Sequence, residues 1–517
     1  MASLRKLRRP GGTRLLWIDA ICIDQNNNKE KSDQIRRMSL IYAGATQVLV
    51  DLGEKYDDSD IAMELLSNYT YDSFFLPVND RATQSIVSLL KRPWFWRIWV
   101  IQEVAWAWKV IAMCGSASAP FTVMASALGN PSVAKTHEQV VEGLTLDRLL
   151  LTLPGLSYRN PEQLRDYWSL DAFYTLLVQT TYCQATDLRD KIFALYPLLE
   201  GSPLGDYNKG LLDLYTDVAK TFLESSLHRS TSLGLLSGLN MVCAVRPHSH
   251  CSPASQLPSW VPDWSTPLEH TPLNILFYSA LGYFKNDLLH ETVHDEQTPD
   301  QMSEFLSPPV LPFRSETALE CRAWLQDEVA FTRPILTTRH NWIRELLVEI
   351  HMSPQLAVQG AKSEIASRYL KTIALLHHNS FFWSKYGHVC RKDMTSLPYH
   401  TSYQAAWLSF EGALLRHLHA DMVGEFETRT KFATRGRHLF LTKNGYMGLG
   451  LQDIRPGDRV FTFAQTSFPF ALRKVPCDPD RQFLGDVVYT LVGECWVEEL
   501  IDLQMDFDKP WERTTIV

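Results

Sequence analysis

The chain has 517 residues, of which 45% are hydrophobic and 21% charged, and its formal net charge is −8. This is the composition of a folded protein with two to four domains, and its acidic balance argues against nucleic acid as the main partner. Nine cysteines without a Cys-x-x-Cys pair indicate reduced thiols and a cytoplasmic protein. We expect no membrane span, because no apolar run approaches the roughly 18 residues that crossing a bilayer requires. Residues 1–11 form a basic tail.

The segment Leu15–Gln25 is the most informative stretch of the chain. Eight of its first nine residues are apolar, the exception is Asp19, and the run ends at Asp24. A short apolar run that stops at a carboxylate predicts a strand buried on both faces. Ligands of open α/β sheets lie at the carboxyl ends of such strands, so this end predicts a binding site.

The residues that follow indicate a βαβ unit with parallel pairing. Apolar residues spaced three and four apart predict a helix over 26–45, capped by Ser32 or by an upstream asparagine. Thr46–Gly53 then repeats the character of the first strand. Helical stretches are expected from Asp57 and over Thr83–Leu90.

A tryptophan-rich segment closes this first part of the chain. The sequence predicts a buried helix from Arg92 to Ala107, with Pro93 at a first helical position, because its residues are apolar nearly all round. Lys109–Cys114 then predicts a third strand. Residues 12–120 therefore form an α/β segment.

The rest of the chain divides by its pattern into four segments. Residues 121–270 are expected to be mostly helical, 271–340 lack clear periodicity and suggest a variable insertion, and 341–431 are again helical. Residues 432–517 alternate as strands do and predict a small antiparallel β module. Its expected strands are His438–Thr442, Arg459–Ala464, Phe470–Lys474 and Val487–Val492.

Several motifs, in this order and spacing, resemble the fungal heterokaryon-incompatibility (HET) domain family. The first group is Leu16–Gln25, Met38-x-x-Ile-Tyr-x-x-Ala45, Val48–Gly53 and Arg92-Pro-Trp-Phe-x-Arg-x-Trp-Val-x-Gln-Glu103. Pieces further along resemble the C-terminal extension common in these proteins: Asp187-x-Arg-Asp-Lys-Ile-Phe-Ala-Leu195, Pro258–Trp264, Gly445–Gly450, Gly457-Asp458 and Leu491–Glu494.

The resemblance implies a death effector of fungal allorecognition, with protein partners in non-self recognition and with self-association left open. It also implies a flavodoxin-like, TIR-like parallel sheet. Family members begin with a strand that carries a Tyr-x-x-Leu-Ser-Tyr-x-Trp-Gly motif, which is absent before Leu15. We therefore expect an N-terminally truncated domain whose first strand is missing.

Glu103 is the candidate catalytic residue. The HET domain is remotely similar to TIR domains, some of which cleave NAD with a glutamate four residues after a tryptophan, and Trp99-Val-Ile-Gln-Glu103 has that spacing. Independently, a carboxylate among tryptophans is desolvated and its pKa tends to rise, as at many active sites. The alternative is a structural ion pair with an arginine, for which the candidates are Arg14, Arg36, Arg37 and Arg97.

Asp19, Asp24 and Trp99 are the candidate substrate-binding residues. The two carboxylates would contact ribose hydroxyls and Trp99 would stack on a planar ring, with NAD as substrate and no bound cofactor. Turn and cap formation by the aspartates, and core packing by the tryptophan, are the alternatives. We expect no metal site, because His248-x-His250-Cys251 lacks a fourth ligand.

Three functions remain open at the level of sequence. The first is a death effector that acts as an NAD glycohydrolase through Glu103. The second is a non-catalytic protein-interaction module, and the third is a decayed, inactive copy.

Overall fold

The computed structural model describes part of the chain, which its contacts divide into two compact units. The described residues are 7–8, 11–68, 81–128, 170–199, 205–226, 241–242, 256–273, 318–334, 433–463, 466, 468–476, 487–497, 500 and 512–517. The first unit comprises Met1–Asp217 with Ser252–Ala254 and Asp263–Leu268, and the second comprises the remainder.

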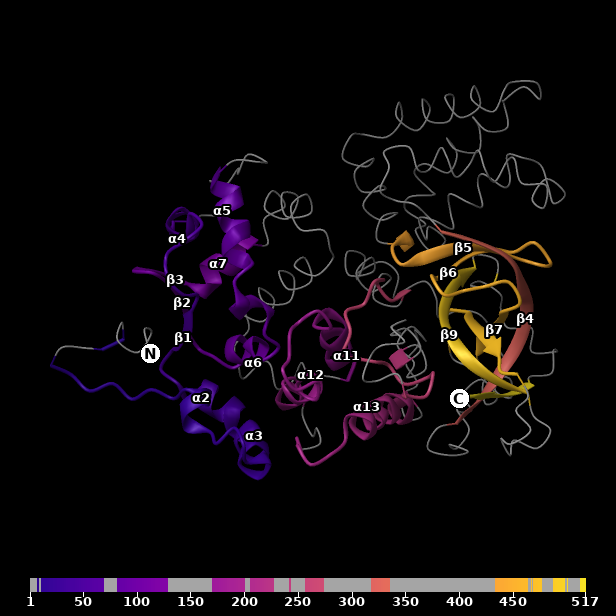
Figure 1. The fold of residues 1–517 in the computed structure, drawn as a ribbon, viewed down its shortest axis with the longest axis horizontal. Coiled ribbons are helices and arrows are strands. Elements are labelled where there is room, and N and C mark those ends of the chain that lie inside the picture. The colour runs from indigo at the N-terminus through magenta and orange to yellow at the C-terminus, as the bar shows by residue number, and fades with distance from the viewer. Residues whose placement is uncertain are drawn as a thin grey trace, which may run out of the picture. The chain divides into compact units, whose positions relative to one another are not determined.

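A small mixed sheet lies in the first unit. Strand β1 (Val48–Asp51) pairs in parallel with β2 (Val110–Cys114), and β2 pairs antiparallel with β3 (Ala117–Pro120). Helices α4 (Ser59–Ser67) and α7 (Phe121–Leu128) pack along these strands, and α5 (Arg81–Leu90) packs on α4 (Figure 1). The α/β character and the strands expected at 46–53 and 109–114 are confirmed, but the described sheet is mixed and is not the parallel, TIR-like sheet that the resemblance implied.

Helix α3 (Asn28–Gly44) also confirms its prediction, including a cap by an upstream asparagine. The side chain of Asn27 accepts hydrogen bonds from the backbone of Lys29 and Glu30, which satisfies two amides that the first helical turn leaves unpaired. Ile35 and Met38 lie on the buried face of the helix.

The strand predicted over Leu15–Gln25 is wrong. Residues up to Ile18 are without regular structure, and a short helix, α2, covers Asp19–Cys22. The carbonyl oxygen of Ile18 accepts hydrogen bonds from the amides of residues 21 and 22, and no described strand lies beside the run. Without a neighbouring strand to satisfy its backbone, a local turn is the better solution.

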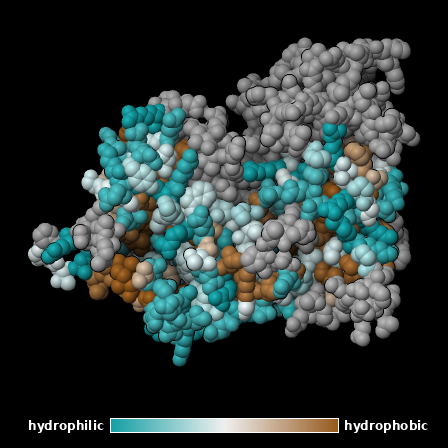
Figure 2. Space-filling view, viewed as in Figure 1, coloured by the Kyte–Doolittle hydropathy of each residue, from teal (hydrophilic) through white to brown (hydrophobic). Residues whose placement is uncertain are grey.

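This segment carries exposed apolar side chains instead of a buried core. Leu15 is 98% exposed and Ile21 is 66% exposed. Figure 2 shows hydrophobic surface over the part of the chain that leads into α2. The expected burial on both faces is therefore absent here.

The single helix predicted over residues 92–107 is also wrong. The segment forms a 3-10 helix, η2 (Pro93–Trp96), and then α6 (Val100–Ala105). Between them Arg97 is extended and forms a β-bridge with Gln184, whose carbonyl oxygen accepts the amide of Ile98. Pairing with a distant segment thus overrides the local helical pattern.

Further helices confirm a helical region after residue 121. They are α11 (Leu170–Gln179), α12 (Asp190–Phe193), η3 (Tyr196–Leu198) and α13 (Leu211–Ser226). The helices expected over 341–431 lie outside the described residues.

The second unit contains a sheet of seven described strands that is mainly antiparallel. These are β4 (Leu319–Pro334), β5 (Arg437–Thr442), β6 (Met447–Leu451), β7 (Arg459–Phe463), β8 (Phe470–Lys474), β9 (Val488–Val497) and β10 (Glu512–Ile516). Their order is β10-β4-β5-β6-β9-β8-β7, and β4 also pairs with β7, so the sheet closes on itself. The expected antiparallel module is confirmed, with β5, β7, β8 and β9 near their predicted positions.

Strand β4 closes this sheet, although its residues gave no clear pattern in the sequence. It pairs with β10 near its start, with β7 over Ala323–Glu328 and with β5 from Val329 onward. Two register irregularities interrupt these ladders. Such bulges bend a strand and let it change partners.

A buried ion pair fixes the chain before β4 to the closed sheet. Arg437 and Glu494 lie 2.6 Å apart with side chains almost fully buried. The same carboxylate oxygen accepts the amide of Leu273, and the guanidinium donates to the carbonyl oxygen of Thr271. Burying this pair without these extra hydrogen bonds would be unfavourable.

Candidate functional site

A cavity of about 1070 Å³ lies within the first unit. Its walls come from α2 and α3, from the turn before α6, and from the segment between α11 and α13. The lining residues are Asp19, Ile23, Gln25, Lys31, Ile35, Met38, Arg97, Trp99, Gln184–Asp190, Tyr207 and Leu211. The lining combines apolar side chains with charged ones, as the sites of small polar molecules do.

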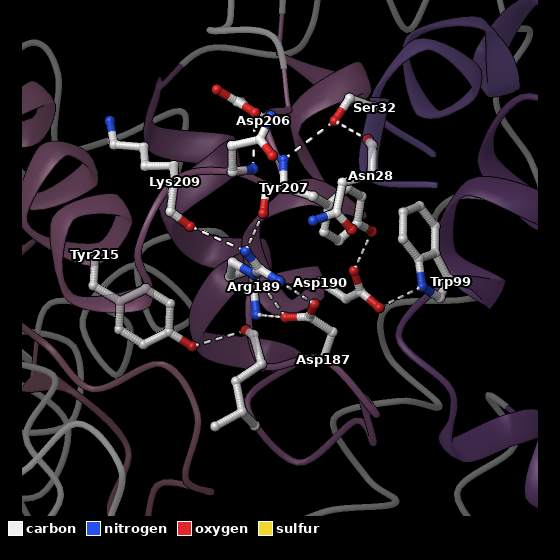
Figure 3. Close-up of polar contacts among 12 residues, drawn as sticks. Asn28, Ser32, Trp99, Asp187, Arg189, Asp190, Asp206, Tyr207, Lys209 and Tyr215 are labelled. Carbon is white, nitrogen blue, oxygen red and sulfur yellow. Dashed lines mark hydrogen bonds and ion pairs between the residues drawn. The ribbon is translucent and has the colours of Figure 1, made fainter. Parts of the chain in front are cut away.

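Two polar contacts join the α3 wall to the residues before α13. Ser32 is buried, and its hydroxyl donates to the carbonyl oxygen of Asn28 and accepts the amide of Tyr207 (Figure 3). The ammonium group of Lys31 lies 4.1 Å from the centre of the Tyr207 ring, a cation–π geometry.

An arginine-centred network builds the opposite wall. Arg189 donates to both carboxylate oxygens of Asp187, at 2.9 and 2.7 Å, and to the backbone carbonyl oxygens of Tyr207 and Lys209 (Figure 3). Burial opposes ionisation of Asp187, but these hydrogen bonds from Arg189 hold its pKa below the usual value. Asp187 and Arg189, both part of the Asp187–Leu195 motif, therefore form a structural ion pair.

Asp190 connects this wall to the tryptophan turn. One carboxylate oxygen accepts the hydroxyl of Tyr207, and the other accepts the indole N–H of Trp99 at 3.1 Å (Figure 3). The residue is buried, and this burial raises the pKa of the Asp190 carboxyl although both hydrogen bonds act against the increase.

Two of the predicted substrate-binding residues, Asp19 and Trp99, line the cavity together. Asp19 lies 3.6 Å from the guanidinium of Arg97, and both side chains are partly exposed. The Asp19 carboxylate also accepts the amide of Ala20 at the start of α2. The ion pair with Arg97 ties α2 to the turn before α6.

Asp24 is exposed and is not among the residues that line the cavity. Its carboxylate accepts the amide of Asn26 at 3.0 Å, and its own amide donates to Glu30. This is the turn-forming role that the sequence left open as the alternative.

Glu103, the predicted catalytic residue, lies on α6 beside the cavity but does not line it. Its carboxylate accepts the indole N–H of Trp94 at 2.9 Å, and the side chain is half-buried. Burial raises the pKa of Glu103, while the Trp94 hydrogen bond and the charge of Arg97 act in the opposite direction. Arg97 therefore influences both Asp19 and Glu103.

Tyr42 lies close to the same acidic pair. Burial, followed by the negative charges of Glu103 and Asp19, raises the pKa of its hydroxyl above the ordinary value. Tyr42 also packs edge-on against Trp17. An aromatic hydroxyl thus remains protonated beside the two carboxylates.

The carboxyl end of β1, where ligands of open sheets usually bind, is filled by Arg92. Its guanidinium donates to the backbone carbonyl oxygens of Leu52, Glu54 and Tyr56 and stacks 4.0 Å from the Tyr56 ring. The side chain is 2% exposed. The cavity beside α3 is therefore the candidate site, rather than this end of the strand.

Within the described ranges no three His, Cys, Asp or Glu residues gather in a way that could hold a metal ion. The His248–Cys251 pattern lies outside them. Among the helices that the structure describes, none combines the length and apolar character that crossing a membrane requires.

The described parts define a multidomain protein with an α/β unit that holds a cavity and a second unit built on a closed antiparallel sheet. Residues 1–103 match the family described as heterokaryon incompatibility protein (HET), and residues 336–511 match the Het-6 beta-barrel domain. The resemblance to the HET domain family that the motifs indicated is therefore confirmed. No solved structure matches it.

A relative in Neurospora crassa extends the similarity to almost the whole chain. It is named heterokaryon incompatibility protein 6, OR allele, and it is 25% identical over 564 residues, which cover 94% of this chain and 81% of the relative. Strands β4 and β10 lie just outside the 336–511 match, although β4 pairs with β5 and β10 pairs with β9 inside it.

Sequence reasoning missed Tyr207 and the role of Asp190 in the cavity. In the sequence Asp190 stands out only as part of the Asp187–Leu195 motif, and Tyr207 lies 175 residues after its partner Ser32. The motif Asp187–Lys191 was the available signal, because four of its five residues are charged and an apolar run, Ile192–Leu195, follows them.

Proposed function

We propose that this chain acts in heterokaryon incompatibility, as a cytoplasmic effector of fungal non-self recognition and programmed cell death. The single observation that carries this proposal is the similarity over 94% of the chain to a protein named for heterokaryon incompatibility. Protein partners that report non-self fusion are part of the proposal.

At the chemical level, the proposed activity is NAD glycohydrolysis in a TIR-like HET domain. Asp19 and Trp99 line one cavity, and Glu103 follows Trp99 by one helical turn with a raised pKa. In the reaction, water and NAD give ADP-ribose, nicotinamide and a proton. A carboxylate beside the ribose stabilises the positive charge that develops as nicotinamide leaves.

Glu103 reaches the reacting ribose only if the substrate extends past Arg97 toward α6. Arg97 interacts with both carboxylates. It forms an ion pair with Asp19, and its positive charge acts against the rise in the pKa of Glu103. A diphosphate bound at Arg97 would therefore place the adjoining ribose near α6. In this proposal Asp24 contacts a ribose hydroxyl only after NAD has bound, because its side chain is exposed and does not line the cavity.

The experiment measures nicotinamide release from NAD by the purified full chain and by Glu103→Gln. Glutamine keeps an oxygen that accepts the Trp94 indole N–H, so the variant removes the charge and preserves the structural contact. We expect Glu103→Gln to lose activity by ~100-fold or more. Glu64→Gln, an exposed position on α4, is the matched control and should retain full activity.

Equal turnover by the wild type and Glu103→Gln would contradict the catalytic role of Glu103. An absence of turnover in the wild type would contradict NAD glycohydrolysis while leaving the incompatibility function in place. The two levels of the proposal are therefore tested separately.

The second candidate is a non-catalytic interaction module, which one observation favours. Glu103 is already bonded to Trp94 and lies outside the cavity lining, as expected for a structural carboxylate. If this candidate is correct, fungal cells that express Glu103→Gln will die on incompatible fusion as often as cells with the wild type. Loss of cell death together with loss of NAD cleavage would exclude it.

A further inference from the structure

Asp190 is the residue outside the HET match that contacts the tryptophan of the candidate site. It lies 91 positions after Trp99 in the sequence and accepts that indole N–H at 3.1 Å (Figure 3). Residues 1–103 form the matched part of the family, so this contact joins the HET region to a segment beyond it.

The contact determines which part of Trp99 is available to a ligand. An indole has a single polar donor, its N–H group. Because that donor is held by Asp190, Trp99 can offer a bound molecule only its aromatic surface. The N-cap position of Trp99 on α6 fixes the backbone end of the same side chain.

Asp190 is itself held firmly in place. Its second oxygen accepts the Tyr207 hydroxyl, and the amide of Tyr207 donates to the buried Ser32 of α3. A chain of hydrogen bonds thus runs from α3 through Tyr207 and Asp190 to Trp99, along the wall of the cavity. Buried polar networks of this kind fix side-chain orientation when every member is satisfied.

We propose that Asp190 is a positioning residue of the cavity, which holds Trp99 by its indole N–H so that the aromatic face is presented to the ring of a bound nucleotide. This inference rests on the proposed function for the identity of the ligand. The orientation of Trp99 does not depend on that identity. Trp99 is then a stacking residue and makes no polar contact with the ligand.

The first arm of the test observes Trp99 directly in the full chain. The protein is labelled with 5-fluorotryptophan, and Trp99→Phe identifies the signal of Trp99 among the 15 tryptophans. Asp190→Ala should shift and broaden that signal, and Asp190→Asn should leave it close to its wild-type position, because asparagine keeps an acceptor oxygen. Asp60→Ala, an exposed position on α4, is the control and should leave it unchanged.

The second arm measures NAD affinity in a double-mutant cycle. We expect Asp190→Ala to weaken binding about tenfold and Asp190→Asn to stay within about threefold of the wild type. In the Trp99→Phe background, Asp190→Ala should have almost no further effect, because a residue that acts through another loses its effect when the other is removed.

The outcomes separate this inference from the proposed function. If the wild type binds no NAD, the proposed NAD glycohydrolysis fails, and the fluorine signal alone decides whether Asp190 holds Trp99. An unchanged Trp99 signal in Asp190→Ala overturns the inference. The inference is also overturned if Asp190→Ala weakens NAD binding equally in the wild-type and in the Trp99→Phe background. If Asp190→Ala fails to fold, Tyr207→Phe, which removes the other contact of Asp190, should shift the same signal, and no shift contradicts the proposal.

Discussion

Lys191 is a buried cation in the first unit, next to the positioning residue of the cavity. Its ammonium group donates to the backbone carbonyl oxygens of Thr181 and Cys183. Burial lowers the pKa of Lys191 to about 8, against the attraction of Cys183 and Asp263. At neutral pH the buried charge of Lys191 therefore lowers the free energy of unfolding.

This cost predicts a pH dependence of stability. Between pH 8 and 10.5 the unfolded chain holds the Lys191 proton and the folded chain does not, so the free energy of unfolding rises with pH over this window. Lys191→Met removes that contribution. From pH 8 to 10, the thermal unfolding midpoint of the wild type should rise relative to that of Lys191→Met. Lys91→Met, at an exposed position, should show no such trend.

Trp94 predicts a second effect at the scale of one residue. Its indole N–H stabilises the charged form of Glu103, so Trp94→Phe should raise the pKa of Glu103 further above the ordinary value. A carbon-13 titration of labelled glutamate side chains, assigned with Glu103→Gln, measures this shift. Trp108→Phe is the control, because Trp108 is 58% exposed. An unchanged Glu103 pKa would show that the hydrogen bond contributes nothing to its ionisation.

Residue types near the site were partly predictable from the sequence. Asp19 and Trp99 were selected because they belong to motifs with a recognisable spacing, and both line the cavity. Asp190 meets Trp99 only through folding, across 91 positions of sequence, and Tyr207 meets Ser32 across 175. No local pattern encodes such contacts, which is why this wall of the cavity was not foreseen.

At the scale of elements, local patterns succeeded where neighbouring segments agreed with them. Helix α3 has its own cap and its own apolar face, and it forms where the pattern indicated. The runs at 15–25 and 92–107 have equally clear patterns, but one lacks a pairing partner among the described strands and the other pairs with Gln184. Tertiary context decided both cases.

Strand β6 gives a prediction about packing in the closed sheet. A Cβ atom at Gly448 would lie 2.6 Å from the backbone carbonyl oxygen of Trp496 on β9, and it would also meet the ring of Phe440. Gly448→Ala should therefore destabilise the second unit by about 1–3 kcal/mol. Thermal unfolding of the full chain measures this loss of stability, which should lower the midpoint of the transition that belongs to the second unit.

Gly44, at the end of α3, is the matched control for that substitution. An added Cβ meets no atom within 4 Å there, and alanine is the better helix former by about 0.5–1 kcal/mol. Gly44→Ala should be neutral or slightly stabilising. Equal destabilisation by both substitutions would contradict the packing explanation.

At the scale of the whole molecule, the HET match does not coincide with a compact unit. The first unit reaches Asp217 and includes pieces up to Leu268. Strand β2, Gln184 and Tyr207 all lie beyond residue 103, yet they pair with residues inside the match. The folded unit is therefore larger than the region that sequence similarity defines.

This predicts different behaviour for two N-terminal fragments. A fragment of residues 1–270 should unfold in one cooperative transition, because it keeps the partners of Ser32, Arg97 and Trp99. A fragment of residues 1–120 should show no cooperative transition, since it exposes the apolar surfaces that those partners cover. Calorimetry of both fragments is the measurement, and cooperative unfolding of the shorter one at the same temperature would refute the prediction.

The central claim is that the cavity between α3, the Trp99 turn and the Asp187–Asp190 wall is the functional site. Hydrogen–deuterium exchange of the full chain, with and without NAD, tests it most directly. We predict slower exchange on adding NAD in peptides that cover residues 19–38, 97–103 and 184–211, and no change in the strands of the second unit. Protection confined to the second unit, or no protection anywhere, would contradict the claim.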